Sequence, residues 1–163
     1  MFSVIFPGQG SQLVGMGKDL HDKYSLVQDL FKEADDTLGF SLSNLILNGP
    51  KEELDLTENT QPAIFLLSYS IFKLIKEEFK IDLDKAKFYA GHSLGEFSAL
   101  VANGVLDFED GLRLVAQRSL AMQKACEQEL STMAAIIGLA DEKVEEICAE
   151  TEGVVVAANY NCP

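Results

Sequence analysis

Hydrophobic residues recur every three or four positions along much of the first part of the chain, which is the spacing of a buried helix face. Most of residues 16–38 is therefore predicted to be helical, and Gly39 after them is a C-terminal stop. Ser41 is predicted to cap a short helix that ends at Asn48-Gly49-Pro50. Thr60-Gln61-Pro62 is predicted to open a long helix, because proline is tolerated in a first turn.

Two short apolar runs have the pattern of buried strands instead. Residues 3–6 are closed by Pro7-Gly8, and residues 87–90 lead into a glycine-rich turn. A helix is expected over residues 96–102, and another after Asp107. Strands that alternate with helices are typical of the α/β class. The sequence therefore predicts an α/β domain over residues 1–128.

The pattern changes after residue 128. Residues 133–139 and 153–158 predict strands, and residues 142–150 predict a helix between them. A β-α-β run needs further strands to cover its sheet. Residues 129–163 are therefore expected to be the start of a second, unfinished unit.

Charge excludes several classes of partner. The net charge is −13, and no basic run or stripe occurs. Nucleic acid is therefore not an expected partner, and an anionic membrane surface is disfavoured. No apolar run is long enough to span a bilayer, and the first residues lack the basic start of a signal peptide.

Cysteine and histidine usage argues against a metal centre. The three cysteines, Cys126, Cys148 and Cys162, are widely spaced and form no C-x-x-C pair. They predict reduced thiols in a cytoplasmic protein rather than disulfides or a zinc site. Only two histidines occur, His21 and His92, so no histidine-rich metal site is expected.

The pentapeptide Gly91-His92-Ser93-Leu94-Gly95 fits the G-x-S-x-G nucleophile elbow, a sharp strand-to-helix turn that exposes a serine hydroxyl. Chance alone gives about 0.05 such matches in a chain of this length, and the predicted strand and helix around it lower that figure. A serine there can attack an ester or thioester. The Leu94 N–H is the expected first oxyanion donor. A second donor is expected from the glycine-rich loop after residue 6. Without Ser93, that loop would be interpreted as a plain turn.

The general base is missing from this pattern. His92 is adjacent to Ser93, and neighbouring side chains on a sharp turn diverge, so a place in the pocket lining is favoured over a role as base. His21 lies in an acidic helical stretch and is most simply a surface residue.

Arg118 follows Ser93 by 25 residues (118 − 93) and has apolar neighbours on its predicted helix. A guanidinium on an apolar face is costly unless it is paired, and a carboxylate can pair with it through two hydrogen bonds. That carboxylate can belong to a substrate or to one of the chain's own acidic residues.

Three motifs together resemble the malonyl-CoA:acyl carrier protein transacylase family: residues 6–12 (FPGQGSQ), 91–96 (GHSLGE) and 118–123 (RSLAMQ). Residues 56–63 and 159–163 also look like family segments. The match covers the whole chain in the right order. Two departures stand out, because Ser119 replaces the usual glycine and the family is roughly twice this length.

The resemblance implies that Ser93 is acylated, that Gln9 and the Leu94 N–H form the oxyanion hole, and that Arg118 holds the malonyl carboxylate. It implies transfer of malonyl from coenzyme A to acyl carrier protein in fatty acid biosynthesis, with no cofactor. The implied fold is a large α/β hydrolase-like domain with a ferredoxin-like small domain inserted. The family's catalytic histidine lies in a Gly-Pro-x-His segment that these residues lack.

Two alternatives remain open. The elbow equally permits a serine thioesterase or esterase, for which Arg118 would have no special role. The chain as given can also be an inactive amino-terminal fragment, because it lacks the implied histidine base.

Overall fold

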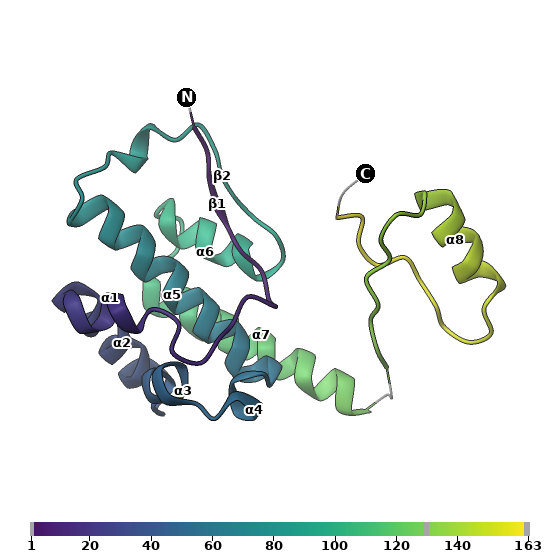
Figure 1. Cartoon of the computed structure of the whole chain (residues 1–163), viewed down its shortest axis with the longest axis horizontal. Coiled ribbons are helices and arrows are strands. Elements are labelled where there is room, and N and C mark those ends of the chain that lie inside the picture. The colour runs from purple at the N-terminus through teal and green to yellow at the C-terminus, as the bar shows by residue number, and fades with distance from the viewer. Residues whose placement is uncertain (1, 129–130, 162–163) are drawn as a thin grey trace. The chain divides into compact units, whose positions relative to one another are not determined.

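The computed structural model describes residues 2–128 and 131–161 (Figure 1). Two units divide the chain, Met1–Glu129 and Leu130–Pro163. The elements of the first unit are β1 (Val4–Phe6), α1 (Lys18–Lys23), α2 (Ser25–Leu38), α3 (Leu42–Asn48), α4 (Lys51–Leu54), α5 (Thr57–Glu77), a 3-10 turn (Leu83–Lys85), β2 (Tyr89–Gly91), α6 (Leu94–Ala102) and α7 (Phe108–Gln128).

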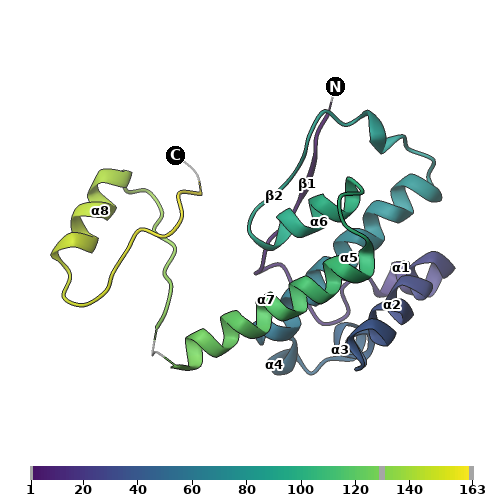
Figure 2. The ribbon, with the colours of Figure 1, turned by 180° about the vertical axis from the view of Figure 1, so that it is seen from behind.

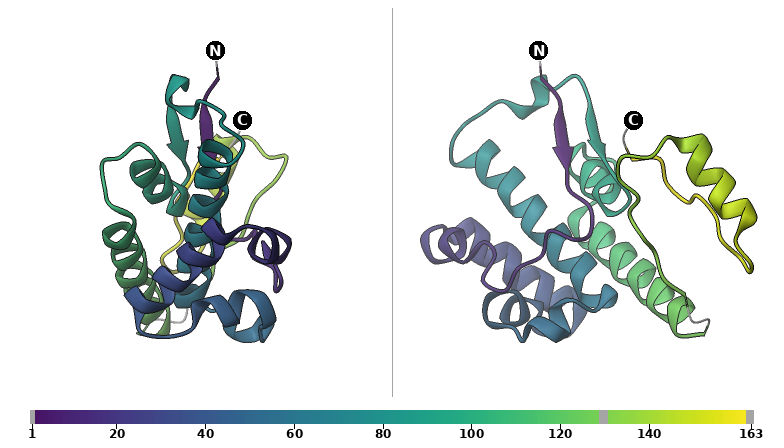
Figure 3. Two further views of the ribbon diagram at one scale, coloured as in Figure 1. Left: turned by 90° about the vertical axis from the view of Figure 1, so that its left-hand side faces the viewer. Right: turned by 45° about the vertical axis from the view of Figure 1, so that its right-hand side comes forward.

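The two strands of the first unit pair in parallel. Val4 lies opposite Tyr89 and Phe6 lies opposite Gly91. Figure 3 shows β1 and β2 side by side, and α6 packs against both. Because parallel strands end at the same edge of a sheet, the loop after β1 and the turn after β2 start next to each other. This register positions the candidate site.

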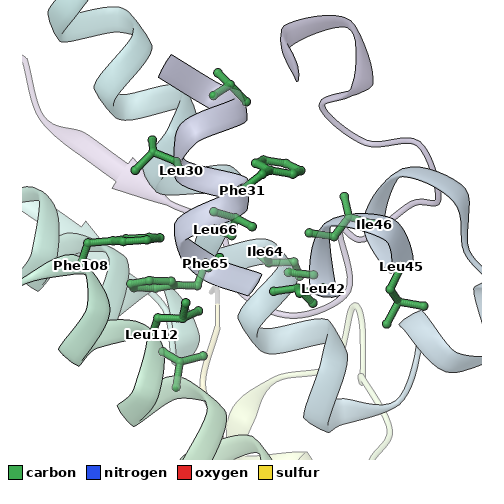
Figure 4. Close-up of a cluster of buried hydrophobic side chains, with 14 of the residues drawn as sticks. Leu30, Phe31, Leu42, Leu45, Ile46, Ile64, Phe65, Leu66, Phe108 and Leu112 are labelled. Carbon is green, nitrogen blue, oxygen red and sulfur yellow. The ribbon is translucent and has the colours of Figure 1, made fainter. Parts of the chain in front are cut away.

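Helix α5 runs through the core of the first unit and packs against α2, α6 and α7 (Figure 2). Side chains from α2, α3, α5 and α7 converge in one cluster (Figure 4). Phe65 of α5 is fully buried and stacks on Phe108 of α7 with ring centroids 5.9 Å apart. Burying one such side chain contributes about 1.5–3 kcal/mol. The core therefore fixes α7 against α5, and α7 carries Arg118.

The helices of the first unit largely follow the sequence pattern. The predicted 16–38 helix is interrupted at Tyr24, which is extended (φ −122°, ψ 119°) and separates α1 from α2. Ser41 caps α3 as predicted, since its hydroxyl accepts from the Asn44 N–H at 3.4 Å. The long helix starts at Thr57 rather than Thr60, so Pro62 lies in its second turn.

Helix α5 tolerates Pro62 because the carbonyl that the proline leaves unpaired has another neighbour. A residue with an N–H at position 62 would donate to the Glu58 carbonyl four residues earlier. The Ser119 hydroxyl of α7 lies 3.2 Å from that oxygen, and 2.8 Å from the Ala116 carbonyl. Helix α7 thus supports the start of α5 where the proline interrupts it.

The second unit contains α8 (Asp141–Glu150), close to the predicted helix, but no strand within residues 131–161. The strands predicted over 133–139 and 153–158 are therefore wrong. A strand forms only against a neighbour that pairs its N–H and C=O groups. Neither segment has such a neighbour here, and Ile137 and Val154 are 90% and 97% exposed.

No helix in the described part of the chain is both long and apolar enough to cross a membrane.

Candidate active site

Ser93 occupies a strained turn between β2 and α6. Its backbone has φ 54° and ψ −109°, a positive φ that a non-glycine residue rarely adopts. It precedes α6 directly, and its carbonyl accepts from the Glu96 N–H at 3.2 Å. The hydroxyl is exposed. This geometry agrees with the predicted elbow, and such strain is typical of functional sites.

The two outer glycines of the elbow are required by close approach. A Cβ on Gly91 would lie 2.0 Å from the Gly95 carbonyl carbon, and a Cβ on Gly95 would lie 2.4 Å from the Phe6 carbonyl oxygen. Both obstacles are backbone atoms that a rotamer change cannot move. The start of α6 therefore sits directly against the end of β1.

The loop after β1 lies against the elbow and is anchored on its far side. A Cβ on Gly8 would lie 3.1 Å from the His92 carbonyl oxygen. Gln12 donates to Asp55 at 3.1 Å. Hydrogen bonds from Lys51 and then from Gln12 hold the pKa of the Asp55 carboxyl below its usual range. The loop that carries Gln9 is thus fixed at both ends.

Arg118 points at Ser93. Its Nη2 donates to the Ser93 Oγ at 2.7 Å, and its guanidinium carbon lies 5.7 Å from the centre of the Phe97 ring. Within residues 2–128 and 131–161 no carboxylate forms an ion pair with it. The internal salt bridge, one of the two interpretations of the sequence, is therefore not formed here. The positive charge lies beside Ser93 instead.

Gln61 is part of this site and was missed by the sequence analysis. Its side chain, 1% exposed, accepts from the Arg118 Nη1 and donates from Nε2 to the Gln9 Oε1 at 3.3 Å. The Gln9 Nε2 donates in turn to the Thr57 Oγ1 at 3.3 Å. The signal in the sequence was a single amide at the start of an apolar helical run. That signal does not reveal the partners of Gln61, which lie 52 and 57 residues away along the chain.

The predicted oxyanion donors come from two different segments of the chain. Leu94 is the first residue of α6, where the helix provides no carbonyl partner for the backbone N–H. Gln9 is connected to Ser93 by a chain of hydrogen bonds that passes through Gln61 and Arg118. Their roles as oxyanion donors stay predictions.

Neither histidine forms a hydrogen bond with Ser93 in the described residues. His92 is exposed, and its backbone carbonyl accepts from the Gly95 N–H at 2.9 Å. His21 is half-buried rather than fully at the surface: its side chain is 26% exposed, but its ring centroid lies 5.3 Å from that of Phe31 and its Nδ1 is buried. His21 lies on α1 and forms no described hydrogen bond with a residue of the elbow.

Nothing in the described part of the chain groups histidine, cysteine, aspartate or glutamate side chains for metal binding. Cys126 and Cys148 are free thiols. Cys162 lies outside the described residues, as does the end of the family-like segment at 159–163.

The site can therefore present a hydroxyl and one guanidinium to the same small molecule. A hydroxyl at a helix N-terminus suits attack on a carbonyl carbon, because the positive end of the helix dipole stabilises the negative charge that develops. The guanidinium suits an acyl group that carries its own anion.

Known proteins are similar to this chain in both sequence and fold. The family model of the acyl transferase domain matches residues 3–163. The malonyl CoA-acyl carrier protein transacylase of Haemophilus influenzae is 47% identical over 99% of this chain and 52% of its own length. The chain thus spans about half the length of the curated relatives it matches.

Solved structures agree. The malonyl-CoA:acyl carrier protein transacylase of Helicobacter pylori superposes with a TM-score of 0.83 at 36% identity, over 93% of this chain and 48% of that one. A malonyl-transacylase in complex with a type II PKS acyl-carrier protein superposes with a TM-score of 0.80 at 41% identity, over 91% of this chain and 47% of that one.

Proposed function

The chain belongs to the acyl transferase domain family, and from this premise we propose that it carries the nucleophile of a malonyl transferase. Ser93 takes a malonyl group from coenzyme A and passes it to acyl carrier protein, in fatty acid biosynthesis. The observation that carries the proposal is the 2.7 Å contact between the Arg118 Nη2 and the Ser93 Oγ. It joins a reactive hydroxyl to a cation able to bind the free carboxylate of malonate.

In the first half-reaction the Ser93 Oγ bonds to the thioester carbonyl carbon and its proton passes to a base. The family resemblance implies a histidine for this role, in a Gly-Pro-x-His segment that these residues lack. The tetrahedral oxygen takes up negative charge, which the Leu94 N–H and Gln9 stabilise. The carbon–sulfur bond then breaks, and coenzyme A leaves as a thiol once it is protonated.

In the second half-reaction the phosphopantetheine thiol of acyl carrier protein attacks the acyl-serine ester, and the Ser93 hydroxyl is restored. Exchange between thioester and ester changes no oxidation state, so the proposal includes no redox cofactor. Malonyl-CoA is a substrate. The acyl carrier protein bound to the related malonyl-transacylase supports this choice of acceptor.

Arg118 favours transfer over simple hydrolysis. Fixing the carboxylate end of the acyl group holds its carbonyl in one orientation, which favours attack by a positioned thiol over attack by loosely held water. A serine thioesterase or esterase would use the same elbow without needing this contact.

The proposal extends to the fold and the compartment. The strand–elbow–helix connection supports a hydrolase-like large domain over residues 1–128. The resemblance assigns residues 129–163 to the start of a ferredoxin-like small domain. Helix α8 supports this assignment, whereas the absence of strands within residues 131–161 does not. The free thiols of Cys126 and Cys148 support a cytoplasmic location.

The test is acylation of the full-length protein by malonyl-CoA, followed by intact mass measurement. We expect one malonyl adduct that is absent from Ser93→Ala. An adduct that survives Ser93→Ala, or no adduct at all, would refute the proposal.

Selectivity separates the two enzyme classes. Losing a hydrogen bond to a charged group costs about tenfold to a hundredfold in rate, so Arg118→Ala should slow malonyl loading by that much and acetyl loading far less. Arg113→Ala is the matched control, because Arg113 lies on the same helix but pairs with Glu109 and Asp110. Equal losses for both acyl groups in Arg118→Ala would indicate a generic hydrolase.

A further inference from the structure

We propose that Gln61 is a specificity-determining positioning residue, which holds the Arg118 guanidinium through a neutral acceptor and so leaves its charge available to an acidic acyl group. The inference rests on the proposed function, because it concerns which acyl groups Ser93 accepts. Gln61 itself touches no reacting atom in this arrangement and acts through Arg118.

The first observation is the way in which the guanidinium is held. One terminal nitrogen, Nη1, donates to the Gln61 Oε1, and the other, Nη2, donates to the Ser93 Oγ at 2.7 Å. Gln61 is 1% exposed. A buried partner with one orientation fixes the plane of the guanidinium, which determines where a carboxylate can form two parallel hydrogen bonds.

The second observation is the charge of that partner. Gln61 is an amide, and no carboxylate of the described residues forms an ion pair with Arg118. A glutamate at position 61 would occupy the same acceptor position and neutralise the guanidinium. The substrate carboxylate would then meet an ion pair instead of an unpaired cation, and its binding would weaken.

The third observation is the orientation of the Gln61 amide. Its Nε2 donates to the Gln9 Oε1 at 3.3 Å and lies 3.3 Å from the Met122 sulfur. These contacts place the amide nitrogen away from Arg118 and the amide oxygen toward it. They also couple the carboxylate clamp to the loop that carries Gln9, so one buried side chain aligns both halves of the site.

The test compares acylation rates of Ser93 by malonyl-CoA and acetyl-CoA in the full-length protein and in Gln61→Glu. Neutralising the cation should slow malonyl loading about tenfold or more and acetyl loading by less than about twofold. Gln117→Glu is the matched control. It adds the same charge on α7, one residue before Arg118 and on an exposed side chain, and it should leave the ratio of the two rates unchanged.

A double variant shows whether the effect passes through Arg118. In an Arg118→Ala background, Gln61→Glu should no longer change the ratio of the two rates. If Gln61→Glu slows both acyl groups equally, or slows neither, the ratio of the two rates is unchanged. Either result would overturn the inference, and equal slowing would indicate a purely structural residue. If Gln61→Glu does not fold, Gln61→Leu replaces it, and an unchanged ratio in folded Gln61→Leu also overturns the inference.

Calorimetry with free malonate separates this inference from the proposed function. Gln61→Glu should weaken malonate binding about tenfold, and Gln117→Glu should not. Should the unmodified protein load neither acyl group, the proposed function fails, and the malonate affinities still decide the role of Gln61. Equal malonate affinity in the protein and in Gln61→Glu overturns the inference.

Discussion

The backbone of Ser93 stores strain that the surrounding residues must offset. A serine in this region of φ and ψ costs on the order of 1–3 kcal/mol. The contacts that hold it there are backbone contacts, between Gly91 and Gly95 and between Gly95 and Phe6. The nucleophile therefore depends on two residues with no side chain at all.

The elbow glycines give a test at this scale. Gly95→Ala forces a Cβ to within 2.4 Å of the Phe6 carbonyl oxygen, and we expect a loss of about 3 kcal/mol or more in the free energy of unfolding. Urea denaturation measures it. Gly104→Ala is the control, because Gly104 has φ +75° but open space around it, so that only about 1 kcal/mol of torsional strain is expected. A Gly95→Ala loss no larger than that of Gly104→Ala would contradict the steric argument.

Motifs locate some site residues from sequence alone and not others. Ser93 lies in a local pattern whose glycines have a geometric role, and Arg118 was singled out because a cation on an apolar face needs a partner. Gln61 lies within the family-like segment 56–63, but nothing in that segment assigned it a role in the site. Its importance lies in hydrogen bonds to residues 52 and 57 positions away, which only the packed helices reveal. For Arg118, the residue pattern alone did not choose between an internal and an external partner, and only the family resemblance favoured the substrate.

At the scale of elements, α5 and α7 share a hydrogen bond that compensates for Pro62. Ser119→Ala removes the hydroxyl that lies near the Glu58 carbonyl. We expect a loss of about 1 kcal/mol in the free energy of unfolding, together with faster amide exchange in the first two turns of α5. Thermal or urea unfolding and hydrogen exchange measure the two effects.

Ser43→Ala is the comparison for that experiment, since its hydroxyl bonds to Asp35 of α2 and not to a carbonyl of α5. It should also reduce stability but leave exchange at the start of α5 unchanged. If Ser119→Ala leaves exchange at the start of α5 unchanged too, the compensation for Pro62 is refuted.

The contact between α2 and α7 predicts a dependence of stability on pH. Burial, and then repulsion from Glu109, raise the pKa of the Glu33 carboxyl above its usual range, although Lys73 opposes them. The folded protein thus binds a proton at this carboxyl more readily than the unfolded chain does. The contribution of Glu33 to stability therefore falls as the pH rises through the mildly acidic range.

We accordingly expect Glu33→Gln to be more stable than the unmodified protein at pH 7, by roughly a few tenths of a kcal/mol after solvent screening. The difference should disappear below the ordinary pKa of glutamate, where both side chains are neutral. Urea unfolding across this range measures it, with the exposed Glu52→Gln on α4 as control. A Glu33→Gln variant that is less stable at pH 7 would reverse the sign and refute the argument.

Elements whose signals are local were predictable. Ser41 caps α3 through a contact three residues away, and Gly39 follows α2 directly. Elements whose bounds or formation depend on contacts distant in the sequence were not predicted correctly. The long helix begins earlier than Pro62 suggested, and Ser119 of another helix lies near the carbonyl that the proline leaves unpaired. The strands expected over 133–139 and 153–158 needed partners that periodicity cannot supply.

For the molecule as a whole, the two units should differ in protection from hydrogen exchange. Residues 131–139 form no strand, so their amides should exchange about as fast as those of an unfolded peptide, whereas the buried turns of α5 exchange slowest. Helix α8 should fall between them. Hydrogen exchange followed by mass spectrometry checks this order. Protected amides over residues 133–139 would restore the strand that the sequence suggested.

The parallel register between β1 and β2 has a consequence for biosynthesis. Val4 leaves the ribosome long before Tyr89, its partner across 85 positions (89 − 4). Until the later strand emerges, the first strand has no strand to pair with, and the loop that follows it has only its contacts with earlier residues such as Asp55. Ser93 itself follows the second strand, so a nascent chain that ends before residue 93 has neither the paired strands nor the hydroxyl of the candidate site.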